Sequence, residues 1–151
     1  MTIDSERPKS NQHIYDTLLV LKDAGLVASS AAAQVAAAAK VIDLGLGRVN
    51  ADVIIDATAV EVSTGDEIFT VICEFSNSST FASGIVPGPM QYLGDAAAIP
   101  GGGDTDLVAG RYELPFTNVV KDVHYRYMRL YTVVAGTIAT GVNYSAFISK
   151  K

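Results

Sequence analysis

Apolar residues in this chain fall in short runs of strand length, separated by turn-forming residues. The run at 51–62 is rich in β-branched side chains, and the run at 67–76 alternates so that Phe69, Val71, Cys73 and Phe75 share one face. Similar runs follow at 111–119, 125–135 and 142–149. About seven or eight short strands of this kind predict an all-β protein built as a single β-sandwich.

Turn signals between these runs predict how the strands connect. Residues 63–66 (STGD) form a four-residue turn that contains glycine, so we expect the runs on either side of it to pair as a hairpin. Pro115 removes a backbone donor from the run at 111–119, which places that strand at an edge or at a bulge. Residues 77–110 contain Pro87-Gly88-Pro89 and are expected to be mostly loop, with 90–93 as a candidate short strand. Shorter apolar runs at 17–21 and 41–45 predict two further strands.

Residues 28–40 are dominated by alanine and give two competing signals. Alanine has the highest helix propensity, which favours a short helix. The segment has no stripe of larger apolar residues at helical spacing, which favours an extended or irregular chain. We interpret it as extended or irregular and keep the short helix as the alternative.

The chain is expected to divide into a short arm and one domain. Residues 1–13 are polar, contain Pro8 and show no periodicity, so we expect a flexible arm, with the β-sandwich domain covering 14–151. The alternation along the strands predicts a core that includes Phe69, Val71, Phe75, Leu114, Phe116, Leu130 and Ile148.

Charge and composition argue against several classes of function. The formal net charge is −5, so the chain lacks the excess of cations that drives binding to nucleic acid. No stretch approaches the ~20 apolar residues that span a membrane. A single cysteine rules out an intrachain disulfide, and we expect Cys73 to be a buried, inert thiol. We therefore expect no nucleic-acid partner and no membrane partner.

No residue pattern predicts catalysis or a bound cofactor. The two histidines, His13 and His124, have no nucleophile at a catalytic spacing and no further ligands for zinc. Asp104 and Asp106 lack the glutamate and the other ligands of a known calcium loop. We expect a protein without enzymatic activity, cofactor or metal.

Two segments carry a resemblance to a known family. The sequence V-I-D-L-G at 41–45 follows the alanine-rich stretch, and R-Y-M-R-L-Y at 126–131 precedes a Gly/Thr/Ala turn and N-Y-S-A-F-I at 143–148. In this order the segments resemble the jelly-roll capsid cement, or decoration, proteins of short-tailed and related tailed bacteriophages. The resemblance covers residues 14–149 apart from 87–89, and residues 1–13 lie outside it.

The resemblance implies a jelly-roll-like β-sandwich that forms a homo-oligomer, either a dimer or a trimer. Its partner is then the major capsid protein. Its place is the outer capsid surface of the virion, where it straddles neighbouring capsid subunits and stabilises the shell. Low charge content (18%) and apolar residues on both faces of 51–62, such as Ile54 and Val60 opposite Val53 and Ile55, also favour self-association. The alternative class is a carbohydrate- or receptor-binding β-sandwich of a phage surface or tail structure.

Capsid or oligomer contacts are expected in the arm with the two residues that follow it, about Met1 to Tyr15, and in the loop at 81–93. Apolar side chains in these segments exceed what a solvated segment needs, and prolines restrict the loop before binding. The predicted contact residues are Ile14, Tyr15, Ile85, Val86, Pro87, Met90 and Tyr92. The alternative is that the loop packs on its own domain and that the arm is a disordered tail.

Overall fold

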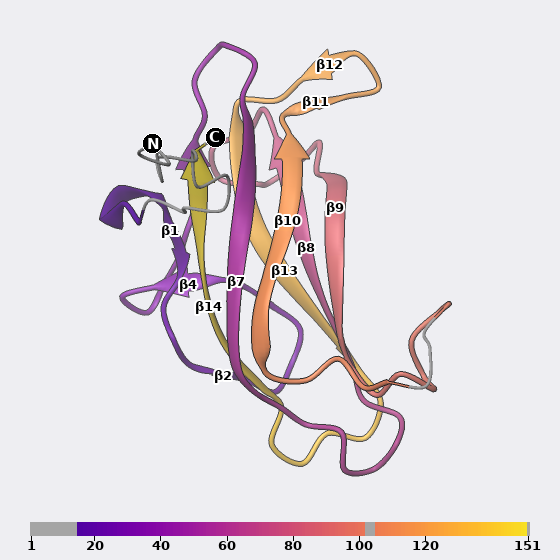
Figure 1. Cartoon of the computed structure of the whole chain (residues 1–151). Coiled ribbons are helices and arrows are strands. Elements are labelled where there is room, and N and C mark those ends of the chain that lie inside the picture. Colours follow the sequence, from indigo (N-terminus) through magenta and orange to yellow (C-terminus); the bar gives the residue numbers. More distant parts are fainter. Residues whose placement is uncertain (1–14, 102–104, 151) are drawn as a thin grey trace, which may run out of the picture.

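Two antiparallel β-sheets packed face to face form the body of the computed structural model, which describes residues 15–101 and 105–150 (Figure 1). Of the described residues, 55% lie in strands and 2% in a helix. Within the described residues the one helical element is η1 (Thr17–Leu19), a single 3-10 turn. The expectation of an all-β sandwich is therefore confirmed. The arm expected at 1–13, together with Ile14, lies outside the described residues.

The first sheet has five strands, four of which follow one another across it. Their order is β1 (Val20–Lys22), β14 (Val142–Lys150), β7 (Asn50–Val60) and β10 (Gly110–Thr117). β2 (Leu26–Val27) also pairs with β14. β10 pairs only with β7, so it forms an edge of the sheet, as Pro115 predicts.

The second sheet is built around β13 (Tyr127–Ala135). One side of β13 pairs with β3 (Ala31–Ala32) and β6 (Ile42–Asp43), and its other side pairs with β8 (Ile68–Ser76), which is followed by β9 (Val86–Gly94). Two small hairpins lie outside both sheets. They are β4 (Gln34–Val35) with β5 (Ala38–Ala39), and β11 (Val119–Val120) with β12 (Val123–His124).

The strand pairs are nested, and this nesting defines the topology. The first strand pairs with the last (β1 with β14), and the next inward pair joins β3 and β6 to β13. β7 then pairs with β10, and β8 pairs with β9. A long hairpin whose successive pairs alternate between two packed sheets is a jelly roll. The jelly-roll-like expectation therefore agrees with the observed strand order.

The hairpin predicted across residues 63–66 is wrong. β7 lies in the first sheet and β8 in the second, so the turn between them crosses from one sheet to the other (Figure 1). The physical reason is that both edges of β7 are already paired, one with β14 and the other with β10. β8 is left to face β7 across the core rather than to pair with it.

Two other segments differ from their predicted structure. The run at 17–21 begins as η1, because the Asp16 side chain accepts a hydrogen bond from the Leu18 amide at 2.9 Å, and the strand starts only at Val20. The expected loop around Pro87-Gly88-Pro89 belongs to β9, an edge strand that tolerates prolines because one of its sides needs no ladder donors. The alanine-rich segment 28–40 is extended or irregular and contains no helix, as interpreted.

The seven predicted core residues are all buried, with exposed fractions between 0% and 7%. They belong to one apolar cluster between the two sheets, to which Tyr144 and Met128 also contribute. A second, smaller cluster lies on the outer side of the first sheet, where Val20, Val35 and Phe147 cover Ile54. Ile54 is fully buried by its own chain, so it does not supply the exposed apolar surface that the sequence suggested.

Candidate functional site

The predicted contact residues that the structure describes, all but Ile14, lie on two opposite sides of the sandwich. Tyr15 is 61% exposed and its ring rests edge-on against Phe147 at 5.2 Å, on the outer face of the first sheet. Met90 and Tyr92 lie on β9, in the second sheet. The structure therefore does not bring all of the predicted contacts together.

The remaining predicted contacts lie at the start of β9. Ile85, 41% exposed, precedes the strand. Val86 is half-buried opposite the core residue Phe75, whereas Pro87 is exposed opposite Glu74. Gly88 stands at an irregularity in the pairing, where a Cβ atom would come within 2.4 Å of the Phe75 ring. The backbone here approaches the core more closely than any residue but glycine allows.

An apolar surface on the outer face of the second sheet contains Met90 and Tyr92. Residues that pair directly across antiparallel strands share a face, and the alternation with buried Val71 and Cys73 turns Ile72 outward. Two rows then cross the sheet, and they run Tyr131–Ile72–Met90 and Val133–Thr70–Tyr92. Thr70, at the centre of the second row, is polar and only 8% exposed, and we call the other five residues the outer patch. Met90 is 41% exposed and Val133 is 38% exposed, so the patch reaches solvent.

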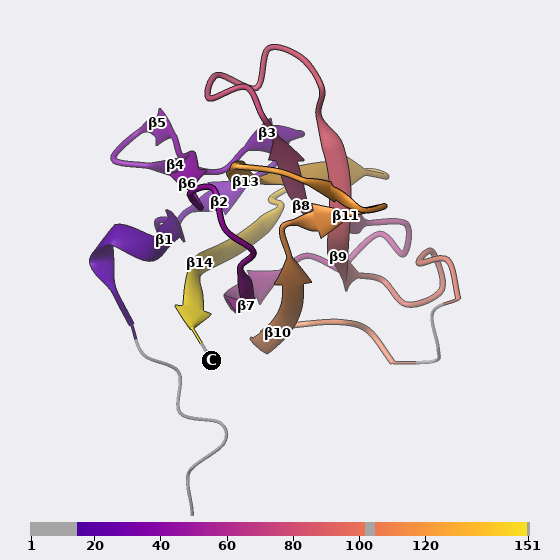
Figure 2. The ribbon, with the colours of Figure 1, turned by 90° about the horizontal axis from the view of Figure 1, so that it is seen from above.

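One border of the outer patch is held by a half-buried ion pair. Arg129 donates to Glu74 at 2.7 Å, and only 17% and 16% of the two side chains are exposed. The Arg129 guanidinium also lies 4.5 Å from the Phe81 ring and 5.5 Å from the Tyr131 ring. Phe81 belongs to the loop at 77–85, which Figure 2 shows on the side of the second sheet that faces away from the first. The loop is thus fixed beside the patch rather than free in solvent.

Charges on this face are paired within the chain. Arg126 binds Asp43 through two hydrogen bonds of 2.9 and 2.7 Å, and these bonds hold the pKa of Asp43 at about 2. With Arg129 bound to Glu74, the described charges around the outer patch cancel.

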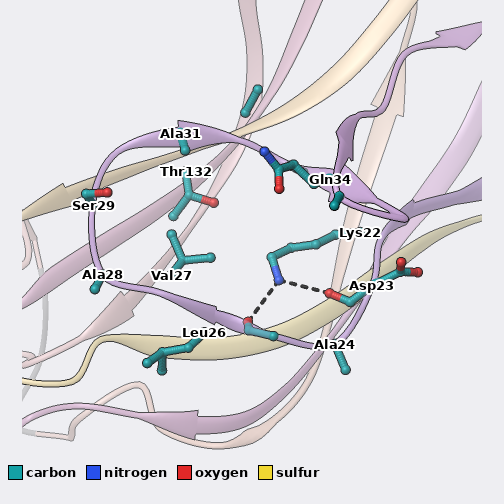
Figure 3. Close-up of a pocket in the computed structure, with 14 residues that line it drawn as sticks. Lys22, Asp23, Ala24, Leu26, Val27, Ala28, Ser29, Ala31, Gln34 and Thr132 are labelled. Carbon is teal, nitrogen blue, oxygen red and sulfur yellow. Dashed lines mark hydrogen bonds between the residues drawn. The ribbon is translucent and has the colours of Figure 1, made fainter.

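A cavity of about 410 Å³ opens beside β1, where the chain passes from the first sheet to the second (Figure 3). Lys22 points into it, yet its ammonium group donates to the carbonyl oxygens of Asp23, Gly25 and Tyr144, each at 2.9 Å. Burial lowers the pKa of Lys22, and the nearby Asp23 carboxylate partly opposes that shift. Because carbonyl oxygens occupy all three donors of the ammonium group, Lys22 fastens the loop and is not available to a ligand.

Two titratable side chains buried in the core stay protonated at neutral pH. Burial raises the pKa of Cys73 to about 12, so its thiol is inert at neutral pH. Burial also raises the pKa of Tyr144 to about 12, and its hydroxyl binds Thr132 at 2.5 Å. No group of histidine, cysteine, aspartate or glutamate residues in the described ranges is arranged to hold a metal ion. His13 and Asp104 lie outside those ranges.

At one end of the sandwich, carboxylates accept hydrogen bonds from backbone amides and so hold the loops in place. Glu67 is fully buried and accepts from the amides of Thr64 and Gly65 at 2.6 and 2.9 Å. Burial raises its pKa, but these hydrogen bonds outweigh that effect and hold the pKa at about 2. Glu61 accepts from the amides of Thr140 and Gly141, so it ties the β13–β14 connection to the end of β7.

The opposite end is fastened by Asn118, a residue that the sequence did not single out. Asn118 is fully buried. Its Oδ1 accepts from the Val49 amide at 2.8 Å, and its Nδ2 donates to the carbonyl oxygens of Gly47 and Tyr125 at 3.1 and 2.9 Å. Nε2 of His124 lies 2.6 Å from the same Gly47 oxygen, so this nitrogen carries the proton and donates. In the sequence, Asn118 falls inside the strand expected at 111–119, and no pattern there indicates these hydrogen bonds.

Comparison with known proteins adds no family assignment. No family model matches the chain, and no curated protein matches it. No helix in the described ranges is long and apolar enough to cross a membrane.

Proposed function

We propose that the chain is a capsid cement protein, which binds the outside of an assembled phage shell across neighbouring major capsid subunits and stabilises it. The observation that carries the proposal is the placement of the two segments on which the family resemblance rests. β6, from the 41–45 segment, pairs with β13, from the 126–131 segment, with Asp43 opposite Tyr127. Arg126 also binds Asp43 through its side chain, and the Arg126 carbonyl accepts from Leu44 at 2.8 Å. The resemblance therefore rests on one structural unit rather than on two unrelated stretches.

The physical basis of such a function requires no chemistry at the site. A protein that binds only the assembled shell stabilises that state by mass action. Contacts with several capsid subunits at once raise the effective concentration of each contact, so each one can be weak. The jelly roll suits this role, because the fixed loops at its two ends and the outer face of the second sheet present separate surfaces to different neighbours.

Self-association is the second part of the proposal, and the outer patch is its surface. The patch presents Met90 and Tyr92 beside Ile72, Tyr131 and Val133, and the charges at its border are paired within the chain. A second copy is the occupant that this neutral apolar face suits best. The Met90→Asp, Tyr92→Asp double variant is expected to be monomeric in light scattering under conditions where the unaltered chain is oligomeric. Thr58→Asp, at an exposed site on the first sheet, is the matched control.

Sedimentation tests the binding function. The protein is mixed with shells assembled from the major capsid protein of the same phage and, separately, with unassembled capsid subunits. Saturable binding to shells without binding to subunits is the expected result. Absence of binding to shells, together with specific signals on a glycan array, would instead identify the chain as a carbohydrate-binding sandwich.

A further inference from the structure

The loop between β6 and β7 presents a leucine to solvent. The Leu46 side chain is 84% exposed, the largest exposed fraction among the large apolar residues in the described ranges. Val123, at the tip of the β11–β12 hairpin, is 48% exposed. Gly47, next to Leu46, and His124, next to Val123, are joined by the 2.6 Å hydrogen bond. The two apolar side chains therefore belong to neighbouring loops at the same end of the sandwich.

This leucine is held out by a loop that is fixed on both sides. Before Leu46, the Asp43 carboxylate accepts from the Gly45 amide at 2.9 Å and also binds Arg126. After Leu46, the Gly47 carbonyl accepts from Asn118 and His124. None of these bonds involves the Leu46 side chain. Because the loop is already fixed, it loses little conformational entropy on binding, and an exposed apolar side chain on such a loop has the property of an anchor residue.

Three basic residues lie in the segments at this end of the sandwich, although the chain as a whole is acidic. Arg48 follows it in the same loop, Lys121 lies in the β11–β12 turn, and Lys150 ends β14, where it pairs with Ala51 at the start of β7. All three are exposed and form no ion pair within the part of the chain that the structure describes. Two acids at this end are exposed as well, Asp122 beside Lys121 and Asp43, whose charge is paired with Arg126. The other end of the sandwich carries negative charge, from Glu61, Asp66 and Glu67.

We propose that Leu46 is the anchor by which this end of the sandwich binds the capsid shell, inserted into an apolar pocket whose rim is acidic. The apolar side chain supplies the contact, and Arg48 and Lys121 supply electrostatic complementarity to the rim. This inference rests on the proposed cement function and names the surface that carries it. It differs from self-association through the outer patch, which lies on a sheet face rather than at this end.

The test uses Leu46→Asp, which changes an exposed side chain that supports no hydrogen bond of the loop. Leu26→Asp is the matched control, because Leu26 is also an exposed leucine, at 59%, and it lies on β2 away from this end. Arg48→Glu tests the proposed electrostatic contact with the acidic rim of the pocket on the shell. Each variant is first compared with the unaltered chain by thermal unfolding. Binding to assembled shells is then measured by sedimentation at two salt concentrations.

The expected result is a loss of shell affinity of at least about tenfold for Leu46→Asp, with Leu26→Asp unchanged. Arg48→Glu is expected to weaken binding at low salt, with a smaller difference at high salt. If the unaltered chain binds shells and Leu46→Asp binds equally well, the anchor is wrong while the cement function stands. If the unaltered chain does not bind shells at all, the cement function and the anchor both fail. Equal losses in Leu46→Asp and Leu26→Asp would overturn the assignment of the surface to this end.

Discussion

Replacing Asn118 by alanine probes the network that fixes the Leu46 loop. The side chain makes three hydrogen bonds to the backbone, with Val49, Gly47 and Tyr125, and it is fully buried. Each such bond contributes about 1 kcal/mol net, and each buried partner left unpaired adds to the loss. We therefore expect Asn118→Ala to lower the free energy of unfolding by about 2–4 kcal/mol.

Urea denaturation at neutral pH measures this loss, with the slope m checked for constancy. Asn143→Ala is the control, because Asn143 is half-buried and its side chain accepts one bond, from the Gly25 amide at 3.1 Å. The control is expected to lose about 0.5–1.5 kcal/mol. A loss in Asn118→Ala no larger than in the control would refute the view that this side chain fastens the loops at this end.

Three further predictions concern other parts of the fold. Gly88→Ala places a methyl group within 2.4 Å of the Phe75 ring and is expected to lower the free energy of unfolding in urea by about 1–3 kcal/mol. Gly47→Ala is the control and is expected to be neutral, because no atom lies within 4 Å of the Cβ that it adds. Ala37 has a φ of 61°, so Ala37→Gly is expected to raise the thermal midpoint by relieving about 0.5–1 kcal/mol of strain, and an unchanged or lower midpoint would contradict this. Because the pKa of Glu67 lies at about 2, below its usual 4.5, its stabilisation is complete above about pH 4.5 and is lost as the pH falls towards 2. Glu67→Gln is expected to make the free energy of unfolding depend less on pH between about 4.5 and 2. If the variant loses stability with acid as steeply as the unaltered chain, Glu67 is not the source of this pH dependence.

Strand faces were predictable from the sequence, because a strand with one buried side imposes a period of two on its residues. Phe69, Val71 and Phe75 show this period, and all three are buried. Strand partners were not predictable in the same way. Residues 63–66 suit a tight hairpin and a crossing between sheets equally well, and the choice depended on β14 and β10, which lie far away in the sequence.

The surfaces were only partly predictable. An excess of apolar residues identified Met90 and Tyr92, but their neighbours Ile72, Tyr131 and Val133 come from two other strands, so only the pairing register brings them together. The prolines at 87 and 89 suggested a loop, since the sequence does not reveal that this strand lies at an edge. Asn118 escaped notice because its partners, at Gly47 and Val49, are distant in the sequence.

A reconstruction of the assembled shell by electron cryomicroscopy, with and without the bound protein, tests the cement function most directly. The account predicts additional density of jelly-roll shape on the outer surface, positioned over the junction between neighbouring capsid subunits, with the loop that carries Leu46 directed at the shell. Density that contacts a single capsid subunit, or a shell that remains bare at saturating protein, would contradict it.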